Sequence, residues 1–155
     1  MGNDVIRADY ARIEGEVRRR VAMLNHNAAA EVDGEAGSEA VSWHEELDML
    51  LLRTRLGQEA RRLSRLLSAW VDPAECMEAD GGWVFRFRFA AEWMEAELVS
   101  ALEEYLTVRL LMYKFESAEP HEPPATGLYA LYAAEEECAL AGLRNLMLRV
   151  EYAAE

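Results

Sequence analysis

Cysteine, histidine and proline are scarce in this sequence. Its 155 residues include two cysteines, Cys76 and Cys138, three histidines and four prolines. No C-x-x-C pair and no histidine at zinc-ligand spacing occurs, which argues against a structural zinc site. The two cysteines could close one disulfide. The alternative is two free thiols in a reducing compartment, with Cys138 filling a core gap as a small hydrophobic side chain.

Basic residues are also few. Sixteen lysines and arginines stand against 29 aspartates and glutamates, which gives a formal net charge of -13 and a pI near 4.7. Such a surface repels phosphate backbones and anionic lipid. We therefore expect neither nucleic acid nor a membrane as a partner.

No apolar run is long and uninterrupted enough to predict a membrane span. The most apolar stretch, residues 98–113, contains Glu103, Glu104 and Arg109, and the first four residues are polar rather than a signal core. Hydrophobic residues nevertheless make up 52% of the chain, which is enough for one core at this length. The expectation is a single helical domain, 1–155, that is cytoplasmic or virion-associated.

What the sequence does have is apolar residues spaced three and four positions apart, which predict four amphipathic helices. The predicted helices cover residues 6–24, 43–70, 94–115 and 127–150. Asn3 or Asp4 is expected to cap the first helix, and Ser42-x-x-Glu45 is a capping box for the second. Residues 25–40 lack any period and are expected to form a mobile linker. The fold class predicted is mainly α, a four-helix bundle-like domain.

The fourth helix carries two adjoining apolar faces. One stripe consists of Leu128, Leu131, Cys138, Ala141, Asn145 and Leu148. The adjoining face consists of Leu140, Leu143, Met147 and Val150. Asn145 on this helix and Arg109 on the third helix interrupt apolar faces, and we interpret both as polar residues that set helix register rather than as ligand contacts.

One segment, residues 73–89, has a period of two and lies between the second and third helices. Asp80-Gly81-Gly82 is a turn signal, so we predict a small β-hairpin with a face of three phenylalanines. The aromatic residues in and just after the hairpin are Trp83, Phe85, Phe87, Phe89 and Trp93. The phenylalanine face is expected to pack against the ends of the second and third helices, because a lone hairpin is marginally stable. The alternative is that part of this set is an exposed interaction patch.

Residue spacing offers no catalytic, cofactor or metal site. His44 and Asp48 share a helix face, but acidic residues in a first turn are explained by the helix dipole. The runs Glu103-Glu104 and Glu135-Glu136-Glu137 are interpreted as solvated faces, since charged residues on helices are mostly exposed. No nucleophile motif and no glycine-rich phosphate loop occurs. We therefore expect a chain without catalysis and without a cofactor.

Part of the chain resembles a group of proteins. Residues 82–89 together with Leu98, Leu102, Glu104-Tyr105-Leu106 and Leu110 resemble small uncharacterised helical proteins of gut Bacteroidetes, some of which look phage-derived. The resemblance covers about forty positions and implies a structural or adaptor protein of a prophage-like element. It transfers no functional residue. The alternative function is a helical-bundle enzyme or a protein that binds a small ligand or metal through scattered residues.

Surplus apolar residues predict self-association. Several lie outside the narrowest stripes of the second and third helices, namely Trp43, Leu51, Leu52, Trp70, Trp93 and Leu111. A four-helix monomer needs mainly one stripe per helix, so we expect a homo-oligomer, most simply a two-fold dimer through the second or third helix. The charge of -13 opposes association, but salt screens it beyond about 8 Å.

Overall fold

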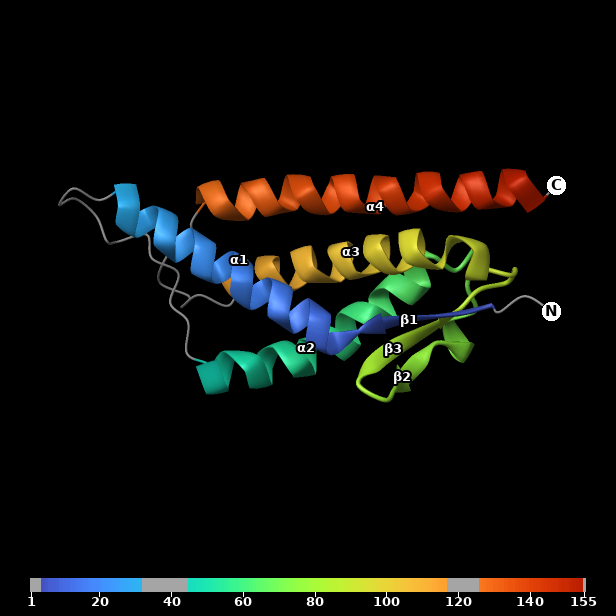
Figure 1. Ribbon diagram of the computed structural model, residues 1–155, viewed down its shortest axis with the longest axis horizontal. Helices are drawn as coiled ribbons and strands as arrows, with labels where there is room; N and C mark the ends of the chain where they lie inside the picture. Colours follow the sequence, from blue (N-terminus) through green and yellow to red (C-terminus); the bar gives the residue numbers. More distant parts are fainter. Residues whose placement is uncertain (1–3, 32–44, 117–125, 155) are drawn as a thin grey trace.

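A computed structural model describes residues 4–31, 45–116 and 126–154, and the side chains within 4–23, 50–113 and 130–151. Four α-helices and a small antiparallel sheet make up these residues (Figure 1). The elements in chain order are β1 (Val5–Asp9), α1 (Tyr10–Glu31), α2 (Glu45–Leu66), the 3₁₀ turn η2 (Pro73–Glu75), β2 (Met77–Ala79), β3 (Gly82–Arg86), the 3₁₀ turn η3 (Glu92–Met94), α3 (Glu95–Glu116) and α4 (Thr126–Ala154). The prediction of a mainly α chain is confirmed.

The predicted hairpin forms, and a third strand joins it. The strand order is β1-β3-β2, with all pairs antiparallel. Asp80 and Gly81 connect β2 to β3 with φ values of 48° and 77°, the left-handed geometry of a two-residue hairpin turn. A side chain at Gly82 would collide with the backbone carbonyl of Ala8, so this glycine lets β1 approach β3.

The first strand corrects the helix predicted from residue 6. Ile6 and Ala8 are buried while Arg7 between them is exposed, which is the alternation of a strand. From the sequence alone, the steps of four and three residues between Ile6, Tyr10 and Ile13 fit a helix as well as a strand followed by a helix. Asp9 caps α1 in place of Asn3 or Asp4, since its carboxylate accepts a 2.8 Å hydrogen bond from the backbone N–H of Ala11.

Two helix ends also differ from the predictions. Helix α1 continues to Glu31, so the first seven residues of the predicted linker 25–40 are helical. Helix α2 stops at Leu66 rather than at the predicted residue 70, and Val71 forms a β-bridge with Phe87. The remainder of the linker, the capping residue Ser42, His44, Trp43 and the prolines of 119–124 lie outside the described residues.

Helix α3 is the centre of the molecule. It packs against α1, α2 and α4 and, near the sheet, against β1. Figure 1 shows α4 running along one side of α3 while α1, α2 and the sheet lie on the other sides. A helix with neighbours on several sides needs apolar residues on several sides. The residues of α3 that are fully shielded from solvent are Leu98, Leu102, Tyr105, Leu106, Val108, Leu110 and Leu111.

Candidate interaction surface

The aromatic residues of the hairpin belong mainly to the core. Trp83, Phe85 and Phe87 are at most 2% exposed, and Phe89 is partly buried with its ring centroid 5.2 Å from that of Phe87. The predicted burial of the phenylalanine face is therefore confirmed for Phe85 and Phe87. These rings cannot belong to an exposed patch, which corrects the alternative interpretation of this set.

Trp83 and Trp93, both members of that set, differ in their exposure to solvent. The indole N–H of Trp83 donates a 3.2 Å hydrogen bond to the hydroxyl of Ser64 on α2, which ties β3 to that helix. Trp93 is 59% exposed, and its indole N–H donates to the carbonyl of Ala90, 3.1 Å away. Of the five residues named from the sequence, only Trp93 offers a largely free ring to a partner.

A buried carboxylate on α2 is paired with arginines. Glu59 is 2% exposed and accepts hydrogen bonds of 3.0 Å from Arg109 on α3 and of 3.0 Å from Arg55. Burial raises the pKa of Glu59, but the hydrogen bond and charge of Arg109 and the charges of Arg55 and Arg62 outweigh it, so the net pKa lies below the usual value. Arg109 thus joins α2 to α3, the structural role expected from the sequence.

A tyrosine on α3 extends this group to α4. The hydroxyl of Tyr105 donates a 3.3 Å hydrogen bond to the carboxylate of Glu136, and Arg109 lies 3.8 Å from the same carboxylate. Burial raises the pKa of Tyr105 to about 12. Such a phenol stays protonated at neutral pH and is a poor general base. The group holds three helices together and contains no activated nucleophile.

The acidic run at Glu103 and Glu104 also has structural partners. Glu103 accepts a 2.8 Å hydrogen bond from the backbone N–H of Asp9 and an ion pair of 2.9 Å from Arg12. Glu104 pairs at 2.8 Å with Arg20 of α1. The interpretation of this run as a purely solvated face is therefore wrong for Glu103, whose carboxylate fixes the junction between β1 and α1.

An open groove lies where α1, α3 and α4 meet. Its volume is about 610 Å³, and it is lined by Arg20, Glu104, Leu131, Tyr132, Ala134, Glu135, Cys138 and Ala139. Its charged side chains contact one another, because Arg20 lies 2.8 Å from Glu104 and 3.8 Å from Glu135. One guanidinium meets two carboxylates, so the groove combines apolar surface along α4 with a small negative charge.

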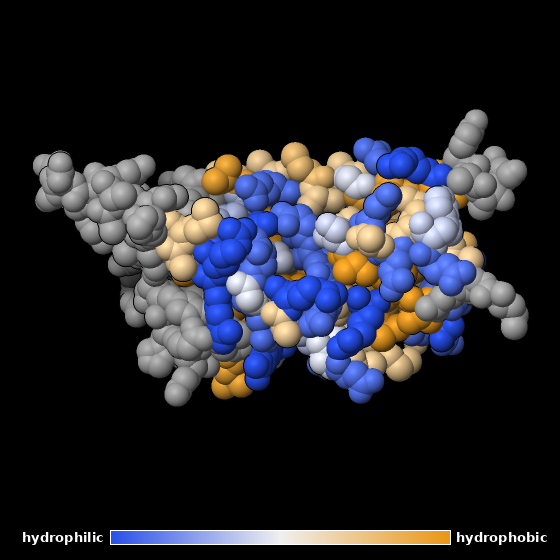
Figure 2. Space-filling view, viewed as in Figure 1, coloured by the Kyte–Doolittle hydropathy of each residue, from blue (hydrophilic) through white to orange (hydrophobic). Residues whose placement is uncertain are grey.

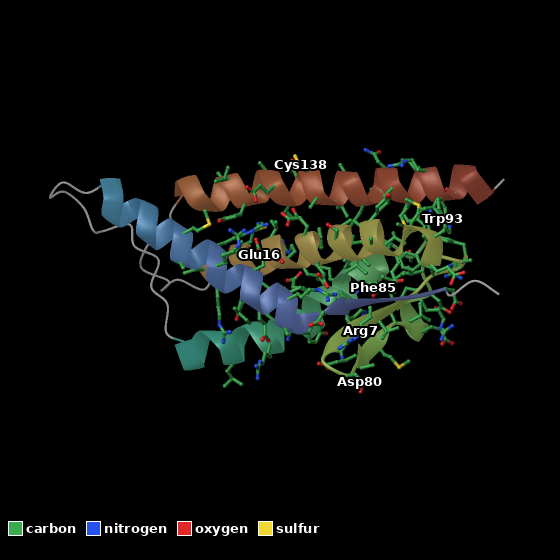
Figure 3. All side chains as sticks on the ribbon, viewed as in Figure 1. Arg7, Glu16, Asp80, Phe85, Trp93 and Cys138 are labelled. Carbon is green, nitrogen blue, oxygen red and sulfur yellow. The ribbon has the colours of Figure 1, made fainter. Side chains whose placement is uncertain are left out.

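The outward side of α4 carries exposed apolar residues along its length. Leu131 is 52% and Leu148 54% exposed, and Cys138 and Asn145 are also exposed. Figure 3 shows Cys138 pointing away from α3, and the surface view in Figure 2 shows apolar residues along the α4 edge. The side turned to α3 carries the buried residues Tyr132, Leu143, Leu146, Met147 and Val150. We call the outward set Leu131, Ala134, Cys138, Ala141, Asn145 and Leu148 the α4 outer stripe.

This orientation corrects two sequence-based expectations. Within residues 130–151, the stripe that contains Cys138 and Asn145 faces solvent, and the adjoining face of α4 packs on the core. Cys138 therefore fills no core gap; Cys76 is the buried thiol, and both cysteines are free. Asn145 does not set register inside the chain, since it is exposed. His26 lies within α1 rather than in a linker.

Metal and membrane signals are absent from the described part of the chain. No group of three or more His, Cys, Asp or Glu side chains there is arranged to hold a metal ion. None of its helices combines the length and apolarity that a membrane crossing requires. Comparison of the chain with protein families, with curated proteins and with solved structures finds no match in any of the three.

Proposed function

We propose that this chain is a non-catalytic protein-interaction module, a bundle-like helical domain of the adaptor or assembly type, which binds protein through the α4 outer stripe. The observation that supports this most directly is the two-sidedness of α4. One side packs on α3, while Leu131 and Leu148 on the other side remain more than half exposed. Exposed apolar surface that continues along a helix marks interaction sites more often than isolated exposed residues do.

The polar residues of the interior support a structural rather than a catalytic role. Glu59, Arg109 and Glu136 are mutually paired across three helices. An active site needs at least one reactive group that is aimed at open space and tuned to its task. Within the described residues the large polar clusters are committed to helix–helix contacts, so they favour the interaction role over the alternative of a bundle enzyme or a metal-binding protein.

Site-specific photo-crosslinking in cells tests the proposal. A photoreactive phenylalanine at Ala134 or Ala141, on the α4 outer stripe, is expected to form adducts with protein. The same residue at Glu97, which is exposed near the start of α3, is the matched control and is expected to form few. Absence of adducts from both α4 positions would overturn the proposal, and so would stoichiometric iron, manganese or zinc in the purified protein.

A further inference from the structure

We infer that the partner of the α4 outer stripe is a second copy of this chain, bound through an antiparallel, two-fold pairing of the two α4 helices. This inference rests on the proposed function and deepens it. The dimer predicted from the sequence uses the second or third helix. Of the surplus apolar residues behind that prediction, Leu52 and Leu111 are buried within the chain, whereas Leu51 on α2 and Trp93 in η3 remain exposed. Helix α4 adds the exposed residues Leu131 and Leu148 at the two ends of one stripe, and the spacing and charges of that stripe favour it as the contact.

The spacing of the stripe is symmetric. Its six members follow one another at intervals of three, four, three, four and three residues, which reads the same from either end. Two such helices running in opposite directions therefore match along their length, about 26 Å at 1.5 Å per residue. Leu131 then lies opposite Leu148 of the partner subunit, and Cys138 lies opposite Ala141 of the partner subunit, next to the two-fold axis.

The size of the side chains fits this arrangement. Leucines stand at the two ends of the stripe, and small residues, Ala134, Cys138 and Ala141, occupy its middle. Small residues in the centre let two helix backbones approach closely, while the leucines at the ends fill the space beyond the axis. Gly142 beside the stripe has no atom within 4 Å of the position of its missing side chain, so none of the described residues blocks that approach.

The charges that flank the stripe are complementary in the antiparallel arrangement. Glu137 and Arg144 are both exposed, on the same side of the stripe, and neither pairs with another described residue. Seven residues separate them, about 10 Å along the helix, which is too far for a direct ion pair within the chain. In an antiparallel pair, Glu137 faces Arg144 of the partner subunit, and the two-fold axis makes this contact twice.

The net negative charge of the chain favours this surface as the site of self-association. Two chains of net charge -13 repel one another, so a contact between copies is favoured where the local surface is neutral. The exposed residues of α4 between 130 and 151 include two glutamates, Glu137 and Glu151, and two arginines, Arg144 and Arg149. The outer side of α4 is therefore an electrically balanced strip on an acidic protein.

One polar residue within the stripe fits a role in register. Asn145 lies opposite Ala134 of the partner subunit in the proposed pairing. A single asparagine among apolar positions of a helix pair disfavours shifted alignments, because a shift leaves its amide against apolar side chains. The register role that Asn145 lacks inside the chain is thus available between two copies.

Light scattering on the purified full chain is the first test. An interface of one helix per protomer is small, so we expect a dissociation constant on the order of micromolar. The measured mass should rise from 17.6 kDa to twice that value between about 1 and 100 µM. Leu148→Glu should remain monomeric over that range. Its melting temperature should equal that of the wild-type monomer. A wild-type mass of one chain throughout would overturn the inference.

A charge exchange tests the antiparallel geometry. Glu137→Arg and Arg144→Glu each place like charges together at both symmetric contacts, and each should weaken the dimer about tenfold at low salt. The double variant Glu137→Arg/Arg144→Glu recreates both ion pairs and should regain most of the wild-type affinity. The matched control Arg149→Glu, on the opposite flank, should give no rescue in combination with Glu137→Arg. A double variant no tighter than either single variant would overturn the antiparallel pairing.

Crosslinking separates the two proposals. A short bis-maleimide should join two copies through Cys138, which lies beside the axis, and Cys138→Ser should abolish the product although Cys76 remains. If the purified chain is monomeric while the photoreactive α4 variants still form protein adducts in cells, the second-copy inference fails and the interaction function stands. If neither the bis-maleimide dimer nor the photo-crosslinked adducts form, both the second-copy inference and the proposed interaction function fail.

Discussion

Helices α3 and α4 are both rich in apolar residues, yet the fold uses them differently. Helix α3 is enclosed by three helices and a strand, and its leucines are shielded from solvent on every side. Among the described elements, helix α4 packs extensively only on α3. It leaves Leu131 and Leu148 more than half exposed. Apolar composition therefore does not measure burial. The number of neighbouring elements decides how many faces of a helix are covered.

The polar residues of the two helices follow the same division. Arg109 of α3 forms a 3.0 Å ion pair with the buried Glu59, whereas Arg144 of α4 pairs with none of the described residues. A charge inside the enclosed helix must be matched by another chain segment, because burial without a partner is costly. A charge on the outer side of α4 needs only water, and it remains available to a partner.

The largest effect expected from this comparison is on the stability of α3. Leu106→Ala removes a fully buried side chain and should cost about 2–5 kcal/mol of unfolding free energy. Leu148→Ala removes the same atoms from an exposed position and should change the stability of the monomer by less than about 0.5 kcal/mol. Urea denaturation at low protein concentration measures both. Equal losses would mean that the outer side of α4 is covered within the chain.

A second comparison concerns the two arginines. Arg109→Met leaves Glu59 buried with a weakened set of partners and should cost about 3 kcal/mol. This loss lies at the low end of the range for a broken buried ion pair, because Arg55 still donates a hydrogen bond to the carboxylate of Glu59. Arg144→Met is the control and should have almost no effect on the monomer. Adding Glu59→Leu to Arg109→Met should recover stability, and a double variant that loses the sum of the two single effects would contradict the pairing.

The smallest effect separates two buried tyrosines. The hydroxyl of Tyr105 donates to Glu136, whereas that of Tyr10 has no hydrogen-bond partner in the described structure. Tyr105→Phe should destabilise the protein by about 1 kcal/mol, and Tyr10→Phe should be neutral or stabilising by up to about 1 kcal/mol. Thermal unfolding followed by circular dichroism has the resolution to tell the two signs apart. A loss of stability in Tyr10→Phe would reveal a partner for its hydroxyl.

The start of the chain shows why part of the fold could not be predicted. Ile6, Tyr10 and Ile13 fit a helical stripe, but Ile6 pairs with Phe85 in the sheet. A five-residue strand holds too few apolar positions to separate a period of two from a period of 3.6. The signal that could have revealed it is Gly82, placed directly after the turn residues, where a second backbone passes too closely for any side chain.

The candidate surface was hidden for a related reason. Both apolar faces of α4 were visible in the sequence, but nothing in their spacing told which of them packs on the core, and Cys138 of the outer stripe was expected to fill a core gap. Spacing reports only that residues share a side of a helix. Which side meets α3 depends on how the side chains of both helices interlock, and this involves residues far apart along the chain.

The sequence by itself determined the mainly helical class, the position of the hairpin turn at Asp80-Gly81 and the shared face of Phe85 and Phe87, because local periods and turn residues carry these features. It also determined the acidic charge. Only the tertiary structure decided that β1 completes the sheet, that α3 is the central helix and that the outer stripe of α4 faces solvent. These depend on contacts between distant segments, for which burial and shape complementarity, rather than local pattern, set the free energy.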